Sequence, residues 1–271
     1  GKSLAGLREN ERFLRQNDRR LVSGVVGAHA SFTLEDSTLT DLSELAAEYD
    51  VGVHIHVAED MCDQADSLRR SNKRVVERLA QSGILTDRAI AAHAVHLDGT
   101  EIGLLQSSGS WIAHNCRSNM NNSVGRSPVS LLGDRVILGT DGLDGDMFTE
   151  TRTAFLRSRE DKLDTMAGDF ISMLSAGASC ATDIFGQPIG GMQPGSAADL
   201  VILDYDSPTP LTADNIAWHW IFGFSPAMVE SVMVGGRWIM RNREFRGLDE
   251  EKVRAESRNQ AKRLWDRMQE L

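Results

Sequence analysis

Two histidines and a glutamate end a stretch that otherwise has the pattern of a buried β-strand, in the sequence VHIHVAE at residues 53–59. Because successive side chains of a strand point to opposite faces, His54 and His56 lie on one face and the three apolar residues on the other. Imidazole and carboxylate groups at the end of a buried strand need a partner that holds them. A divalent metal ion, with the water that it activates, is such a partner. The pattern therefore predicts a hydrolytic metal site, provided that other strands supply further ligands.

Polar side chains also end the other strands that the pattern predicts. His29 ends the segment 25–32, His93 and His96 end 89–95, His114 ends 110–115, and Asp141 follows 136–140. Only His219, among the seven histidines, lies elsewhere. One buried histidine is commonly a satisfied core residue, but five consecutive strands that end in His or Asp are hard to explain by core packing. Active sites of (β/α) barrels are built at this end of the strands.

The elements that must position these groups alternate along the chain. Strand patterns at 25–32, 51–58, 89–95, 110–115 and 136–140 are separated by amphipathic helix patterns at 33–49, 66–82 and 99–107. This alternation predicts an α/β fold with a parallel sheet and crossover helices. After a turn-rich break at 190–195, a strand at 198–203 and a Gly-Gly hairpin at 229–240 predict a small β-domain. A helix is expected from about residue 250.

Composition limits the function classes. The chain has 271 residues, a net charge of -10 and a pI near 5.2, which argues against nucleic acid or an anionic membrane as a partner. No apolar run approaches the roughly 20 residues of a membrane span. The three cysteines, Cys62, Cys116 and Cys180, form no CxxC pair. We therefore expect a reduced, cytoplasmic protein that acts on a small molecule.

Several short motifs together resemble one family. The sequences HVAE at 56–59, AH at 92–93, HNCRSN at 114–119 and GTDG at 139–142 are similar to the amidohydrolase superfamily, in the branch of guanine deaminase, triazine hydrolases and methylthioadenosine deaminase. The wider motifs VAED, RSNMNN and GTDGLDGDMF resemble SsnA-type aminohydrolases most. The resemblance covers about residues 1–243. It implies a partial (β/α)8 TIM barrel with about its last five strands at 1–189, a β-sandwich segment at 190–247 and a C-terminal helix at 248–271.

The resemblance also implies roles for individual residues. His56 and Asp141 would ligate one divalent metal ion, zinc before iron or manganese, and Asp141 would accept a proton from the attacking water. Glu59 would protonate a ring nitrogen of the substrate and pass protons to the leaving ammonia. His93 would orient the nucleophile and stabilise the tetrahedral intermediate, and His29 would contact the substrate together with Glu59 and His93.

Some of these residues also have a purely structural interpretation. Glu59 could be a surface acid at a helix start, and Asp141 could cap a helix after a glycine-rich turn. We interpret His54, which lies deeper in its strand, as a core residue or a residue that supports a ligand.

The residues around the fourth and fifth strand ends allow two interpretations. His114, Asn115, Ser118 and Asn119 are expected to brace the strand-end loop by hydrogen bonds. Asp144 and Asp146 could bind amino groups of a substrate or could order their own loop. Arg117 could meet an anionic substrate group or pair with one of these two aspartates.

One motif of the family pattern has no counterpart in the chain. The pattern includes an HxH on the first barrel strand that supplies two metal ligands, whereas the only HxH here, at 54–56, stands in a different context. We therefore expect the first strands of the barrel to lie upstream of Gly1 in a longer protein. Because catalytic zinc normally has three protein ligands, we also expect the chain alone to bind metal weakly and to have little activity.

Three hypotheses for function follow. The first is a metal-dependent aminohydrolase that attacks a C–N bond of a nitrogen heterocycle such as a purine. The second is hydrolysis of another leaving group, such as chloride or a cyclic amide, and the third is a non-catalytic barrel fragment. Glu59 favours the first, because deamination of a ring amidine requires protonation of the ring nitrogen. The resemblance also allows a homodimer, for which Trp218, Trp220, Phe222 and Phe224 could form an apolar interface or could instead cover the barrel bottom.

Overall fold

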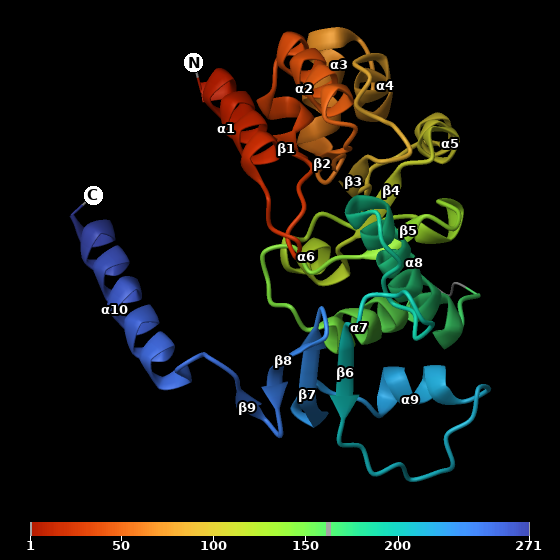
Figure 1. The fold of residues 1–271 in the computed structure, drawn as a ribbon. Coiled ribbons are helices and arrows are strands. Elements are labelled where there is room, and N and C mark those ends of the chain that lie inside the picture. Colours follow the sequence, from red (N-terminus) through yellow and green to blue (C-terminus); the bar gives the residue numbers. More distant parts are fainter. Residues whose placement is uncertain (1, 161–163, 271) are drawn as a thin grey trace. The chain divides into compact units, whose positions relative to one another are not determined.

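The computed structural model describes residues 2–160 and 164–270. The helices and strands, in chain order (Figure 1), are α1 (Lys2–Gln16), β1 (Val26–Ala30), η1 (Ser31–Thr33), α2 (Asp36–Glu48), β2 (Val53–Val57), α3 (Met61–Ser71), α4 (Val75–Gln81), β3 (Ile90–His93), α5 (Gly99–Ser108), β4 (Trp111–His114), α6 (Cys116–Asn121), η2 (Val129–Leu131), β5 (Val136–Leu138), α7 (Met147–Glu160), α8 (Ala167–Phe185), β6 (Leu200–Leu203), α9 (Ile216–Phe222), η3 (Pro226–Met228), β7 (Val229–Val234), β8 (Arg237–Arg241), β9 (Glu244–Phe245) and α10 (Glu250–Gln269). They form two compact units, Gly1–Ser196 with Ser207–Pro226, and Ala197–Asp206 with Ala227–Leu271.

The first unit is built on a parallel sheet with the strand order β1-β2-β3-β4-β5. Each strand pairs in parallel with the next one along the chain, which confirms the α/β fold and the parallel sheet that the alternation predicts. Since the carboxyl ends of parallel strands meet at one edge, the five polar strand ends are brought to the same side of the sheet.

The two faces of this sheet have different neighbours. On one face Val53, Ile55 and Val57 are buried in a core with apolar residues of α2, α4 and α5. On the other face His54 and His56 align with Ile90 and Ala92 of β3. Further along this face, apolar residues of β3 and β4 pack against α8 through Ala176, Cys180 and Ile184. Through these apolar contacts, α8 covers part of the sheet face on which His54 and His56 lie.

Two helices differ from their predicted extents. A single helix was expected at 66–82, but α3 ends at Ser71 and α4 begins at Val75, because Asn72 adopts a left-handed conformation with φ 54°. The hydroxyl of Ser67 donates a hydrogen bond of 2.9 Å to the carbonyl of Lys73, which stabilises the turn between the two helices. The helix expected at 33–49 is present as α2, which begins at Asp36 after the short η1 turn.

The second unit contains an antiparallel sheet with the order β6-β7-β8-β9. The hairpin predicted around the Gly-Gly pair is confirmed, since β7 and β8 pair across Gly235 and Gly236. Both glycines have positive φ, 55° and 79°, which a tight hairpin turn with the natural strand twist requires. The α10 helix follows this sheet, as expected.

No helix within residues 2–160 and 164–270 combines the length and the apolar content that a membrane span requires.

Candidate metal centre

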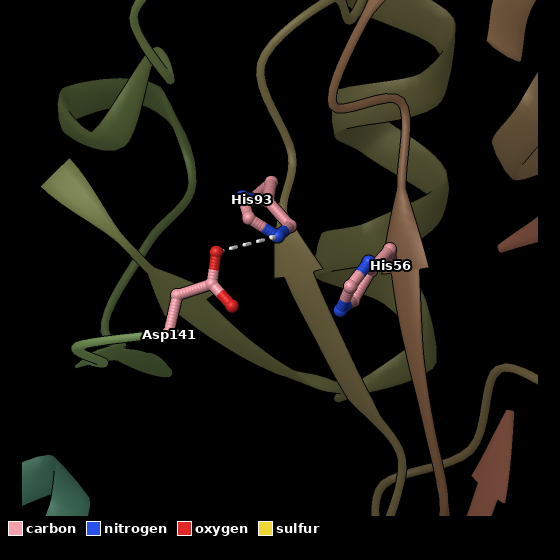
Figure 2. Close-up of side chains that lie close together, drawn as sticks. All are labelled: His56, His93 and Asp141. Atoms are coloured by element: carbon pink, nitrogen blue, oxygen red, sulfur yellow. Dashed lines mark ion pairs between the residues drawn. The ribbon is translucent and has the colours of Figure 1, made fainter. Parts of the chain in front are cut away.

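Three side chains from three strand ends converge at the carboxyl edge of the sheet (Figure 2). His56 lies in β2, His93 ends β3, and Asp141 follows β5. One potential ligand atom from each lies within 4.8 Å of the others, and His93 Nε2 is 3.9 Å from Asp141 Oδ2. The cluster unites two residues proposed as metal ligands with a third, His93, for which the sequence suggested a catalytic role.

The donor set suits a divalent metal ion. Ligands at about 2.1 Å from a tetrahedral metal stand about 3.4 Å apart, so small side-chain rotations would bring these three groups to coordinating distance. Two imidazoles and one carboxylate are ligands that zinc, iron and manganese accept. Three protein ligands would leave a position for water, which is the usual arrangement of a catalytic site.

The protonation states of His56 and Asp141 also suit metal binding. Burial and the neighbouring His93 lower the pKa of His56, which favours the neutral imidazole that a metal needs. Burial alone would raise the pKa of Asp141. Hydrogen bonding from Ser118 and the proximity of His93 outweigh that effect, so the net pKa lies below its ordinary value and the carboxylate is ionised.

Left-handed backbone conformations orient the side chains at the ends of the strands. Asp141 has φ 51°, His93 has φ 72°, and Ala58, two residues after His56, has φ 48°. Such conformations are rare outside glycine and persist only where the surroundings hold them. The Ala58 N–H donates to Asp63 Oδ2 at 2.9 Å, and the Ala58 carbonyl accepts from His96 N–H at 2.9 Å. These contacts hold the segment that carries Glu59.

Glu59 lies against the cluster. Its Oε2 atom is 3.5 Å from His93 Nε2 and 3.9 Å from His56 Nδ1, while Oε1 accepts from Asn122 Nδ2 at 3.2 Å. The carboxylate is therefore oriented at one side of the candidate metal position, within reach of a group held there.

The short helix α6 contacts two members of the cluster. The Ser118 hydroxyl donates to Asp141 Oδ2, and Asn119 Oδ1 lies 2.9 Å from His93 Nδ1. Asn115 Nδ2 lies 3.4 Å from His93 Nε2. These contacts confirm that Asn115, Ser118 and Asn119 brace the strand ends by hydrogen bonds. His114 was expected to do the same, but its Nδ1 atom is buried without a hydrogen-bond partner among the described residues.

The other two histidines of the first strands lie at the edge of the site. The His29 ring on β1 is 5.4 Å from the His56 ring, and its Nδ1 lies 3.2 Å from the Thr33 hydroxyl. His54 is exposed and does not join the cluster, so its interpretation as a core histidine is wrong. It lies in β2 opposite Ile90 of β3, two residues before His56 and on the same face of the strand.

The loop after Asp141 is ordered by internal contacts. Arg117 pairs with Asp144 at 2.8 Å and with the buried Glu150 of α7 at 2.6 Å. Asp146 accepts from the N–H and the hydroxyl of Thr149 at the start of α7. Of the two interpretations, the structure therefore supports loop ordering for both aspartates and ion pairing for Arg117.

Two supporting residues were not identified from the sequence. Asp63 accepts from the Ser31 hydroxyl at 2.8 Å as well as from the Ala58 N–H, and so joins the ends of β1 and β2. Asn122 orients Glu59. A usable signal was the spacing of Asn122, four residues after Ser118 and thus on the same side of the helical turn.

Comparison with known proteins shows the family of the chain. The model of the amidohydrolase family matches residues 4–239. The chain belongs to the amidohydrolase family. This amidohydrolase is 34% identical over 268 residues to a 5'-deoxyadenosine deaminase of Methanopyrus kandleri, covering 95% of the chain and 62% of the relative. It is 31% identical over 254 residues to a 5-methylthioadenosine/S-adenosylhomocysteine deaminase of Syntrophomonas wolfei, covering 90% of the chain and 59% of the relative.

Solved structures have the same fold as the chain. An adenosine deaminase from Xanthomonas campestris with bound zinc superposes with a TM-score of 0.85 at 27% identity, over 97% of the chain and 62% of that protein. An atrazine chlorohydrolase from Arthrobacter aurescens TC1 complexed with zinc shares the fold, with a TM-score of 0.79 at 21% identity over 93% of the chain and 59% of that protein. This amidohydrolase thus spans about three fifths of the length of the relatives that it matches.

Proposed function

We propose that the chain carries the reacting face of a metal-dependent aminohydrolase that releases ammonia from the adenine ring of a nucleoside. The single observation that supports this most is the position of the Glu59 carboxylate, 3.5 Å from His93 Nε2 beside the His56–His93–Asp141 cluster. The deaminase names of the relatives support an adenosine derivative altered at the 5' position as the substrate class.

His56 and Asp141 would be ligands of the metal ion, for which we propose zinc because the similar adenosine deaminase has zinc bound. His93, the third member of the cluster, would orient the nucleophile and stabilise the tetrahedral intermediate. When bound, such an ion supplies Lewis acidity that makes water nucleophilic near neutral pH. Asp141, ionised and oriented by Ser118, would accept the proton that the attacking water loses. Glu59 would deliver its proton to the ring nitrogen next to the attacked carbon, take up the proton of the hydroxyl formed on that carbon and pass this proton to the departing amino group. The proton held by Asp141 would then return Glu59 to its starting form.

His29 would contact the substrate at the edge of the site. The Thr33 hydroxyl donates to the Ala30 carbonyl at 2.8 Å, so that it can only accept from His29 Nδ1. The His29 Nε2 lone pair is then free to accept a hydrogen bond. We therefore propose that His29 recognises a donor group of the substrate, such as a hydroxyl or an N–H.

The five parallel strands would form the last part of a (β/α)8 barrel within residues 1–189. Residues 190–247 would contribute to a β-sandwich, and residues 248–271 would form the terminal helix. The strand order and the extent of the family match support this proposal.

Glu59→Gln tests the reaction. The protein is prepared with any residues that its gene encodes before Gly1, loaded with zinc, and assayed for ammonia from 5'-deoxyadenosine, 5-methylthioadenosine and adenosine. We expect Glu59→Gln to lower the rate by about 10²–10⁴-fold while bound zinc is unchanged, because only the proton carrier is lost.

Asp60→Asn is the matched control. Asp60 is the neighbouring exposed acid that caps α3, and asparagine is an equally good cap, so the rate should stay within about twofold of the parent. Full activity of Glu59→Gln, or no ammonia from any of the three nucleosides with zinc bound, would contradict the proposal.

A further inference from the structure

One amide group lies between the two carboxylates that would exchange protons with the reacting groups. The Asn122 Nδ2 atom is 3.2 Å from Glu59 Oε1 and 3.5 Å from the Ser118 hydroxyl oxygen. The same hydroxyl donates to Asp141 Oδ2. A continuous line of hydrogen bonds therefore joins Glu59, which follows β2, to Asp141, which follows β5.

The surroundings of the Asn122 amide agree on its orientation. Its nitrogen faces two acceptors, the Glu59 carboxylate and a hydroxyl oxygen whose own proton is donated to Asp141. Its oxygen faces a donor, the Nδ2 atom of Asn121 at 3.1 Å. An amide nitrogen carries two protons, so each acceptor receives one of them. In the reversed orientation, the amide oxygen would face the carboxylate and neither acceptor would receive a proton.

The end of α6 holds this amide in place. The Asn122 backbone N–H donates to the Ser118 carbonyl at 2.9 Å, and residue 122 still has helical dihedral angles. The chain leaves the helix at the next residue, Ser123, which has φ 56°. Residues four apart are neighbours on one side of a helical turn. The side-chain contact between residues 118 and 122 therefore follows from the backbone.

The Glu59 carboxylate depends on Asn122 for its orientation. Within residues 2–160 and 164–270, the bond from Asn122 is the only hydrogen bond to this carboxylate. The second oxygen, Oε2, lies 3.5 Å from His93 Nε2 and 3.9 Å from His56 Nδ1. The Glu59 side chain is 24% exposed, so without a donor it is free to turn toward water. Asn122 holds one oxygen outside the cluster and thereby directs the other toward it.

We propose that Asn122 is a positioning residue for deamination, whose amide directs Glu59 with one proton and, through the Ser118 hydroxyl, Asp141 with the other. This inference rests on the proposed function. An amide nitrogen only donates, so the bridge sets the geometry of the two carboxylates and carries no proton between them. The bond to Glu59 is of the stronger, charge-assisted kind.

The bridge is measured directly in the metal-free protein. With ¹⁵N-labelled asparagine, the two side-chain protons of Asn122 give two NMR signals on one nitrogen, which are assigned by their loss in Asn122→Leu. We expect Glu59→Gln to shift one signal strongly, because a charged acceptor becomes a neutral one. Ser118→Ala should shift mainly the other signal. Ser123→Ala is the control, because Ser123 is exposed and lies outside the bridge, and it should move neither signal comparably.

The rate of ammonia release gives the second readout. Asn122→Leu keeps the size of the side chain and removes both donors, and because the position is exposed the fold should stay intact. We expect kcat to fall about 10-fold, while KM and bound zinc change by less than about twofold, because a displaced proton carrier affects the transition state more than binding. Asn122→Gln keeps an amide and should recover part of kcat. Asn122→Asp places an acceptor against Glu59 and should lose at least as much as leucine.

A double variant separates positioning from general damage. If Asn122 acts mainly through Glu59, Asn122→Leu should lower the rate of Glu59→Gln by about threefold or less, although it lowers the rate of the parent about 10-fold. The remaining effect would be the share that acts through Ser118. Damage to the fold would instead lower the rate by the same factor in both backgrounds.

Asn122 signals that do not respond to Glu59→Gln would overturn the inference. A kcat of Asn122→Leu within about twofold of the parent, or equal factors in the two backgrounds, would overturn it as well. The NMR result does not depend on turnover. A protein that shows the bridge by NMR but releases no ammonia would therefore refute the proposed reaction, whereas ammonia release without the bridge would refute only the role of Asn122.

Discussion

The buried carboxylate of Asp63 offers the sharpest test of how the strand ends are held. Its two oxygens accept from two different segments, the Ser31 hydroxyl after β1 and the Ala58 N–H after β2. Ser31 and Ala58 are both fully buried. Asp63→Ala would leave two buried donors without an acceptor, at about 1–3 kcal/mol each, so we expect the free energy of unfolding to fall by about 2–6 kcal/mol.

Asp63→Asn separates the hydrogen bonds from the charge. The amide oxygen can still accept from the Ala58 N–H, and the Ser31 hydroxyl can rotate to accept from the amide nitrogen. Burial raises the pKa of Asp63, which means that the ionised group carries a desolvation cost that asparagine avoids. We therefore expect this variant to lose only about 1 kcal/mol.

Native-state hydrogen exchange of the β2 and β3 amides measures these free energies within the unit that contains Asp63, which matters because the chain has two compact units. Asp41→Ala, an exposed acid of α2, is the control and should change stability by less than about 0.5 kcal/mol. A loss below about 1 kcal/mol in Asp63→Ala, or equal losses in the Ala and Asn variants, would refute this account of the strand ends.

Two further predictions concern the fourth and fifth strand ends. Burial lowers the pKa of His114 to about 4, so this side chain takes up its proton in the unfolded chain at a higher pH than in the folded chain. The contribution of His114 to the free energy of unfolding should therefore be complete above about pH 6.5 and should be lost as the pH drops toward 4. In urea titrations at a series of pH values, His114→Gln should make the free energy of unfolding depend less on pH over this range. A Cβ atom on Gly139 would lie 2.2 Å from Asn115 Oδ1, so Gly139→Ala should cost about 1–3 kcal/mol and weaken zinc binding. The control is Gly142→Ala, where a Cβ would meet nothing within 4 Å; equal effects of the two alanines on the urea midpoint would contradict the clash.

The parallel sheet could be predicted because its signal is local. Each strand is a short apolar run, and each ends in a polar residue that a buried strand would not otherwise contain. The convergence of His56, His93 and Asp141 then follows from strand parallelism, since neighbouring strands end at one edge.

Other features depend on contacts that the local pattern does not contain. The division between α3 and α4 rests on a left-handed Asn72, and asparagine is also compatible with an uninterrupted helix. Helix α1 was not predicted; its Asn10 side chain bonds both the N–H and the carbonyl of Gly27 on β1, a contact between distant parts of the sequence. Asp63 fits an ordinary acid in the first helical turn, and only the folded chain shows its two partners.

The shared origin of the contacts to His93 and Asp141 constrains how this region can change in length. An α-helix turns by about 100° per residue, so one residue inserted or deleted between Asn115 and Ser118 would carry the Ser118 and Asn119 side chains away from both partners at once. No single substitution elsewhere could restore both. Insertions and deletions should therefore be absent from this segment in active relatives and should accumulate in exposed connections such as residues 205–214.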